Sequence, residues 1–154
     1  MNARKSVLTL VAVMLAVTMG FAENPHLGTW KLNEAKSKLT PGLPKNLTAA
    51  YEAVGDNIKT TLDGVDAQGK PTHSEWTGKF DGKDYPVTGD PTSDMRSYKK
   101  INDRTIEATA KKDGKVTLTA RIAISADGKT RTVTVHATDP AGKKIVGTGV
   151  YQKQ

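Results

Sequence analysis

The side chains that could do chemistry in this sequence are few and scattered. The three histidines, His26, His73 and His136, lie on separate segments, and none has a partner at the short spacing typical of a zinc site. The chain has no cysteine, which excludes a thiolate nucleophile and a disulfide. No serine stands in a Gly-x-Ser-x-Gly motif. The sequence therefore predicts neither a metal site nor a catalytic residue.

Two groups of carboxylates could in principle form a calcium loop or a catalytic pair. Asp63 and Asp66 flank a glycine-containing turn, but the turn lacks the alternating oxygen ligands and the closing glutamate of a calcium loop, which favours a hairpin loop. Asp84, Asp90 and Asp94 could supply a hydrolase pair, yet carboxylates between Gly and Pro residues usually form turns. A barrel enzyme stays the third hypothesis, because it requires titratable side chains to converge inside the fold. The side chains whose position would test it are Arg121, His136 and Glu107.

Aromatic and aliphatic residues favour binding instead. Trp76 and Phe80 share one face of an expected strand, and Tyr51 lies among small and apolar residues. Inside a closed sheet such side chains are either core or the wall of a pocket. Ala, Gly and Thr are frequent on the same strands, which favours a lumen that its side chains do not fill. The expected ligand-binding residues are Tyr51, Leu62, Trp76, Phe80, Leu118, Ile122, Val133 and Tyr151.

The elements that must position these residues are strands. No apolar pattern of period 3.6 is long enough for a helix, while short alternating segments recur between Gly-containing turns such as Asp81-Gly82, Asp113-Gly114 and Asp127-Gly128. A meander of this length must close on itself or fold into two layers to cover its edges. The expected strands are 28–33, 46–54, 58–65, 71–80, 85–88, 94–101, 104–111, 115–125, 129–138 and 144–153.

The hydrophobic pattern also predicts strand register. A two-residue turn at Asp127-Gly128 would place the apolar residues of both flanking strands on one face. The expected pairs are Ile122 with Val133, Ala120 with Val135, Arg121 with Thr134 and Thr119 with His136. A three-residue loop at 112–114 would continue that apolar face. The expected pairs there are Ala110 with Val116, Ala108 with Leu118 and Ile106 with Ala120.

The last hairpin contains a conflict. A four-residue loop at 139–142 puts Tyr151 on the polar face with His136 and brings Val146 into the apolar row that should face the interior. A bulge near Gly147 would instead turn Tyr151 inward. Both alternatives stay open from the sequence.

The first residues have the composition of a secretory signal. At 1–22, basic residues precede an apolar run at 7–17, and cleavage is expected after Ala22. The run is shorter than the roughly 20 residues of a membrane-spanning helix. We expect export to the periplasm or the cell exterior, no stable membrane insertion after cleavage, and one domain at 23–154.

The charge is basic but dispersed. The formal net charge is +7, and the lysines are scattered along the expected strands and turns. Because there is no Arg-rich stripe and no regular series of aromatics, the pattern favours a solvated surface over a nucleic-acid partner. Weak attraction to anionic envelope polymers stays an alternative.

Three segments resemble the calycin superfamily, the lipocalin and fatty-acid-binding-protein group, and in particular its small secreted bacterial members. They are Gly28-Thr29-Trp30-Lys31-Leu32, the segment 80–89, and the closing Val150-Tyr151-Gln152-Lys153. The resemblance implies an all-β fold, an antiparallel up-and-down barrel of about eight to ten strands. In that family the tryptophan of Gly-x-Trp closes one end, so Gly28 and Trp30 are expected to form the barrel floor.

The resemblance also has two departures. Fatty-acid-binding proteins hold a carboxylate with an Arg and a Tyr two residues apart on the last strand, whereas here Gly149 precedes Tyr151, so that clamp is not expected. Those proteins also carry two helices after the first strand, whereas Pro41, Gly42 and Pro44 leave room for little more than a turn. We expect the open end to be covered by a loop or left uncovered.

Together these patterns predict an exported, monomeric, non-catalytic barrel that binds a small hydrophobic or amphipathic ligand and needs no cofactor. The alternative is an envelope inhibitor or interaction module that acts through loops such as 80–94.

Overall fold

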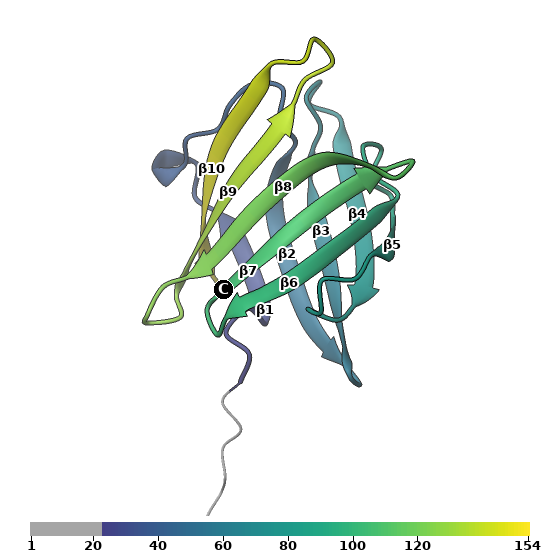
Figure 1. The fold of residues 1–154 in the computed structure, drawn as a ribbon. Coiled ribbons are helices and arrows are strands. Elements are labelled where there is room, and N and C mark those ends of the chain that lie inside the picture. Colours follow the sequence, from purple (N-terminus) through teal and green to yellow (C-terminus); the bar gives the residue numbers. More distant parts are fainter. Residues whose placement is uncertain (1–22) are drawn as a thin grey trace, which may run out of the picture.

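The computed structural model describes residues 23–154. It contains ten antiparallel strands, each paired with the one before it in the sequence, which close into a barrel (Figure 1). β1 pairs with both β2 and β10, and this pairing closes the sheet. The strands are β1 (Gly28–Leu32), β2 (Lys45–Val54), β3 (Asn57–Val65), β4 (Pro71–Gly78), β5 (Tyr85–Thr88), β6 (Met95–Asn102), β7 (Thr105–Lys112), β8 (Lys115–Ile124), β9 (Thr130–Thr138) and β10 (Lys144–Lys153). The all-β, antiparallel up-and-down barrel expected from the sequence is confirmed.

The helical content of the described residues is one 3₁₀ turn, η1 (Glu34–Lys36). Its Asn33 side chain accepts a hydrogen bond from the Lys36 backbone N–H at 3.2 Å, and the chain then continues without a second helix to β2. Within 23–154 no helix is long and apolar enough to cross a membrane. The expected signal segment at 1–22 lies outside the described residues.

The β8–β9 register is confirmed, although the turn differs from the expected one. Ile122 pairs with Val133 and Ala120 with Val135. The Ser125 N–H donates to the Thr130 carbonyl at 2.9 Å, so four residues, and not two, form the loop. Because the longer loop has the same centre, the register is unchanged.

The predicted β7–β8 register is wrong by two residues. Asp113 and Gly114 both have positive φ, 49° and 77°, which is the geometry of a two-residue type I′ turn and not of the expected three-residue loop. A bulge then places Val116 outside, where it is 57% exposed. The observed pairs are Ala110 with Leu118, Ala108 with Ala120 and Ile106 with Ile122. A shift of two residues keeps the same side chains inside, because side chains alternate with period two.

The β9–β10 hairpin resolves the conflict over Tyr151. Thr138 pairs with Lys144, one residue beyond the Lys143 partner that a four-residue loop at 139–142 would give, and the ladder beyond this pair is regular. Tyr151 pairs with Arg131 and faces the interior. The expectation that Val146 lies inside is wrong: it is 50% exposed. No bulge near Gly147 is needed.

The barrel has two different ends. We call the end with the connections that follow β1, β3, β5, β7 and β9 the mouth, and the other end, with residues 23–27, the base (Figure 1). Large side chains fill the interior from its middle to the base, and burying each contributes about 1.5–3 kcal/mol. Those with at most 2% exposure include Trp30, Tyr51, Trp76, Tyr98 and Ile106.

A loop borders the mouth where the family would have helices. Lys38 forms a bridge with Thr148 on β10, and the Leu43 side chain lies over Gly147, where an added Cβ would approach it to 2.8 Å. The expectation of a loop in place of a helical lid is confirmed.

Candidate functional site

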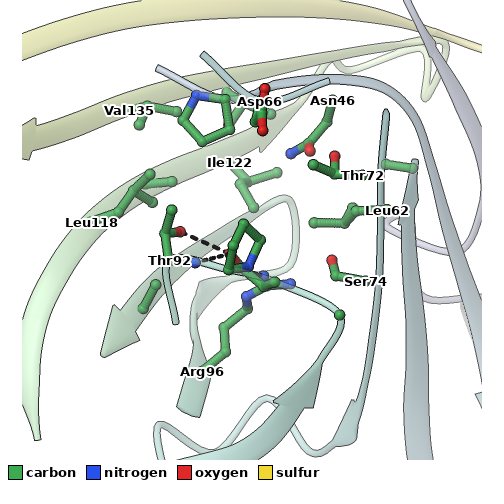
Figure 2. Close-up of a pocket in the computed structure, with 18 of the residues that line it drawn as sticks. Asn46, Leu62, Asp66, Thr72, Ser74, Thr92, Arg96, Leu118, Ile122 and Val135 are labelled. Carbon is green, nitrogen blue, oxygen red and sulfur yellow. Dashed lines mark hydrogen bonds and ion pairs between the residues drawn. The ribbon is translucent and has the colours of Figure 1, made fainter. Parts of the chain in front are cut away.

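The mouth half of the barrel contains an internal cavity of about 130 Å³. This is close to the roughly 150 Å³ of an engineered apolar cavity that binds benzene. Figure 2 shows Leu118 and Val135 on one wall and Leu62, Thr72 and Ser74 on the other, with Arg96 entering between them. The site therefore has room for an apolar group about the size of one aromatic ring.

Arg131 supplies a buried positive charge at the inner end of the cavity. It stands at the start of β9, on the base side of Val133, and is 3% exposed. Its Nη2 donates to the Tyr51 hydroxyl at 2.6 Å, and its guanidinium carbon lies 4.3 Å from the centre of the Tyr51 ring and 5.9 Å from that of Tyr151. These contacts hold the guanidinium without neutralising it.

Arg96 supplies a second buried charge, closer to the mouth. It is 7% exposed and stands at the start of β6, where its Nη2 donates to Asp90 Oδ2 at 2.9 Å. Burial raises the pKa of the Asp90 carboxyl, but hydrogen bonds from Ser93 and Thr92 and the charge of Arg96 outweigh burial and hold it below the usual value. Asp90 is thus a carboxylate at neutral pH and neutralises one of the two guanidiniums.

The segment that carries Asp90 is fixed against the barrel. Gly89 has φ +78°, and a Cβ there would come within 2.0 Å of the His73 carbonyl oxygen, so only glycine fits this close approach. The Thr92 N–H and hydroxyl each donate to Asp90 Oδ1 at 2.8 Å, and the Ser93 hydroxyl donates to Oδ2 at 2.5 Å. The position of the carboxylate is therefore set by backbone geometry and not by Arg96 alone.

The polar groups of the interior are mostly donors. The Tyr51 hydroxyl, bound to Arg131, lies 3.5 Å from that of Tyr98, which links the inner guanidinium to the neighbourhood of Arg96. Arg96 Nη1, Arg131 Nε and Arg131 Nη1 are buried without a hydrogen-bond partner among the described residues. Burying a donor without an acceptor costs about 1–3 kcal/mol, and more for a charged group. An oxygen-rich anion has the complementary chemistry.

Burial keeps the Tyr151 and Tyr98 hydroxyls protonated. It raises the pKa of Tyr151 to about 12, and burial followed by the neighbouring Tyr51 raises that of Tyr98 still further above its usual value. At neutral pH these phenols can form hydrogen bonds but do not exchange protons. These side chains can therefore hold an anion.

A second hollow of about 530 Å³ lies at the base, beside His26, Phe80 and Ile106. Its charged rim, which includes Lys100 and Asp103, is exposed, and both ring nitrogens of His26 are closed off from solvent. Burial, then the charges of Arg131 and Lys100, lower the pKa of His26 to about 4, so the ring is neutral. Because the charged side chains of this rim are exposed, whereas the charged side chains of the mouth cavity include two buried arginines, the smaller cavity at the mouth is the stronger candidate.

Six of the eight predicted ligand-binding residues lie on the wall of the mouth cavity. They are Tyr51, Leu62, Leu118, Ile122, Val133 and Tyr151. Trp76 and Phe80 do not border it: Trp76 packs on Tyr98 with ring centres 4.7 Å apart, and Phe80 lies beside His26 at the base. Their expected place in the wall is corrected to the core and the base, because the strand face that carries them continues past the cavity toward the base.

The predicted floor residues lie at the base, away from the cavity. Trp30 is fully buried, and its Nε1 donates to the His26 carbonyl at 3.0 Å. Gly28 lies against Lys153, where an added Cβ would come within 2.9 Å of the lysine Cε. Their function as a floor stays a prediction.

The sequence interpretation did not identify Arg96 or Arg131 as site residues, and it considered Asp90 only as one carboxylate of a possible hydrolase pair. The two arginines could have been found. Arg131 lies on the same face of its strand as Val133 and Val135, and Arg96 lies on the same face as Tyr98, because every second residue of a strand points to the same side. A charged residue at an inward position of a strand is itself a signal. Asp90 had no such signal, since it stands in a connection.

The three side chains named as a test of catalysis lie outside. Arg121 and Glu107 form an exposed ion pair at 3.2 Å, and His136 is exposed beside them in the sheet. Nor do residues 23–154 contain a group of three or more His, Cys, Asp or Glu side chains that could hold a metal ion. The Asp66 carboxylate, in the expected hairpin loop, accepts from the N–H groups of Gln68 and Lys70 at 2.9 Å.

The segment 80–94, which the alternative hypothesis requires to be an apolar binding loop, is mostly polar where it is exposed. Its exposed apolar residues are Pro86 and Pro91, and the remainder of its exposed surface is Asp, Lys, Gly and Thr. Lys111 pairs with Asp84 at 2.7 Å. This surface does not favour a hydrophobic protein partner.

Comparisons with known proteins add little to this description. No protein-family description and no curated protein matches the chain. Among solved structures, lobster apocrustacyanin A1 matches 86% of this chain and 63% of its own at 12% identity, with a TM-score of 0.43.

Proposed function

We propose that this protein is an exported, non-catalytic binding protein whose barrel holds a small amphipathic anion. The acid group binds at Arg131 and the adjoining Arg96, and the apolar part packs against Leu118, Ile122 and Val133. One observation carries the proposal: two buried guanidiniums border the cavity, and three of their nitrogens have no hydrogen-bond partner. The charge-assisted hydrogen bonds that a carboxylate would form there are the strong type.

The size of the cavity limits the ligand. A volume of about 130 Å³ admits one ring or a short chain but not a long acyl chain. An aromatic or short-chain carboxylate is therefore the favoured class. A longer ligand would have to extend past Asp90 and out of the mouth.

Binding without catalysis follows from the groups that converge on the cavity. Arginines and protonated tyrosines donate hydrogen bonds, and the Asp90 carboxylate is occupied by Thr92, Ser93 and Arg96. A general base near the ligand would need a free acceptor with a pKa close to the working pH. Export is part of the proposal on the strength of the composition of residues 1–22.

Calorimetric titration with benzoate and its neutral isostere benzamide tests the proposal. We expect benzoate to bind and benzamide to bind at least about 10-fold more weakly, since each charged hydrogen bond contributes about 1.5–3 kcal/mol. Arg131→Met should weaken benzoate by a similar factor. Arg121→Met, which removes an exposed arginine, is the matched control and should change nothing. Equal binding of the two compounds, or an unchanged affinity in Arg131→Met, would contradict the proposal.

A further inference from the structure

The charged groups of the cavity are ordered from its inner end to its mouth. β9 runs from the base to the mouth, so Arg131, near its start, is innermost. Arg96 enters from the mouth side, because β6 runs in the opposite direction. Asp90 and Asp66 stand in mouth connections and border the same cavity. The positive end is therefore inside and the negative end faces out.

Of the two buried arginines, only Arg96 is paired with a carboxylate. Asp90 is paired with Arg96 at 2.9 Å, whereas Arg131 has no acidic partner among residues 23–154 and its guanidinium lies against the rings of Tyr51 and Tyr151. Asp66 accepts hydrogen bonds from backbone N–H groups of its own turn and forms no ion pair in the described part of the chain. A bound molecule thus meets one uncompensated cation inside and carboxylates at the exit.

We propose that Asp90 and Asp66 make this site selective for singly charged acids, bound with the acid group inward at Arg131, and that they exclude dicarboxylates of the same width. The inference rests on the proposed function, because it concerns the ligand of the same cavity. A second carboxylate at the far end of the ligand would lie beside Asp90 and Asp66. In a poorly solvated site, repulsion between two like charges is strong.

The segment that carries Asp90 is held in place, so we expect the Asp90 carboxylate not to move aside for a ligand. Asp90 already neutralises Arg96, so a second ligand carboxylate could have its own charge neutralised there only by displacing Asp90. That displacement would also break the hydrogen bonds from Thr92 and Ser93 and would move a segment anchored at Gly89. Neutralising Asp90 with a substitution of the same shape should therefore relax the selectivity without opening the mouth.

Benzoate and terephthalate, which share a ring and differ by one carboxylate at its far end, provide the test. We expect the purified protein to bind terephthalate at least about 10-fold more weakly than benzoate at neutral pH and low salt. Asp90→Asn keeps an acceptor oxygen for Thr92 and should reduce that ratio severalfold. Asp66→Asn provides a second, independent variant in a different loop and should reduce it in the same direction. Circular dichroism and the urea midpoint verify that each variant is folded.

The outcomes separate the two proposals. If benzoate binds and terephthalate binds as tightly, the selectivity is overturned and the binding function stands. If the ratio exceeds 10 but both variants leave it unchanged, the carboxylates are not its cause and the inference is again overturned. If benzoate does not bind at all, both proposals fail.

Discussion

Replacing Arg131 by methionine should weaken ligand binding by at least about 10-fold while changing the stability of the protein little. The substitution removes the hydrogen bond to Tyr51, about 1.5–3 kcal/mol, and a cation–π contact of about 0.5–2 kcal/mol. It also relieves the cost of two buried nitrogens without partners, at about 1–3 kcal/mol each. Methionine has a similar length and fills irregular space. The two sides nearly cancel, so we expect a change of at most about 1 kcal/mol in either direction.

Urea unfolding followed by tryptophan fluorescence measures this change. For a chain of this size the slope m is about 1–3 kcal/mol/M, so the expected change moves the midpoint by about 1 M or less. Arg121→Met, at an exposed ion pair, serves as the control and should cost less than about 1 kcal/mol. Adding benzoate at about 100 times its Kd should raise the stability of the natural protein by about 2.7 kcal/mol, and the same concentration should raise that of Arg131→Met by about 1.4 kcal/mol or less if its Kd is at least about 10-fold weaker.

A large loss of stability would refute the reasoning. Breaking a well-paired buried ion pair costs about 3–5 kcal/mol. If Arg131→Met loses that much at unchanged m, Arg131 is a structural residue with adequate partners, and its unpartnered nitrogens carry no information about a ligand.

Three further predictions concern the base, the mouth and the core. The lowered pKa of His26, about 4, means that the unfolded chain binds a proton more readily than the folded one, so the contribution of His26 to stability is complete above about pH 6.5 and falls as the pH drops toward 4. His26→Leu should remove about 2 kcal/mol of the loss of stability between pH 7 and 4.5 in urea titrations. Parallel curves of stability against pH for the natural protein and the variant would contradict this. Gly89→Ala should destabilise the protein by at least about 1 kcal/mol more than Gly142→Ala. Both glycines have positive φ, but only at Gly89 would the added Cβ clash with a backbone atom, the His73 carbonyl oxygen. Equal shifts of the urea midpoint in the two variants would argue against a rigidly held Asp90 segment. Trp76→Ala should lower the free energy of unfolding by about 3–5 kcal/mol, whereas Val146→Ala, at a side chain that is 50% exposed, should lower it by about 0.5 kcal/mol or less. Comparable losses of stability in the two variants would contradict the assignment of inside and outside faces.

The sequence by itself determined the fold class and nearly all strand positions. Alternation of period two between Gly-containing turns is a local property, and each predicted strand agrees with an observed one to within about two residues. It also determined which face of β8 and β9 is buried, because a slip of one residue would put Ile122 and Val133 on opposite faces. The local signal failed where the length of a turn decides the outcome, as at Asp113-Gly114.

Only the tertiary structure decided the site. Arg131, Arg96 and Asp90 are separated along the chain and come from β9, β6 and a mouth connection, and closure of the barrel brings them to one cavity. The loop at 139–143 turned Tyr151 inward and placed it beside Arg131. Because a one-residue change in a loop reverses the face of every residue after it, the sequence left Tyr151 undecided. The buried charge inside the barrel, which carries the functional proposal, depends on those long-range placements.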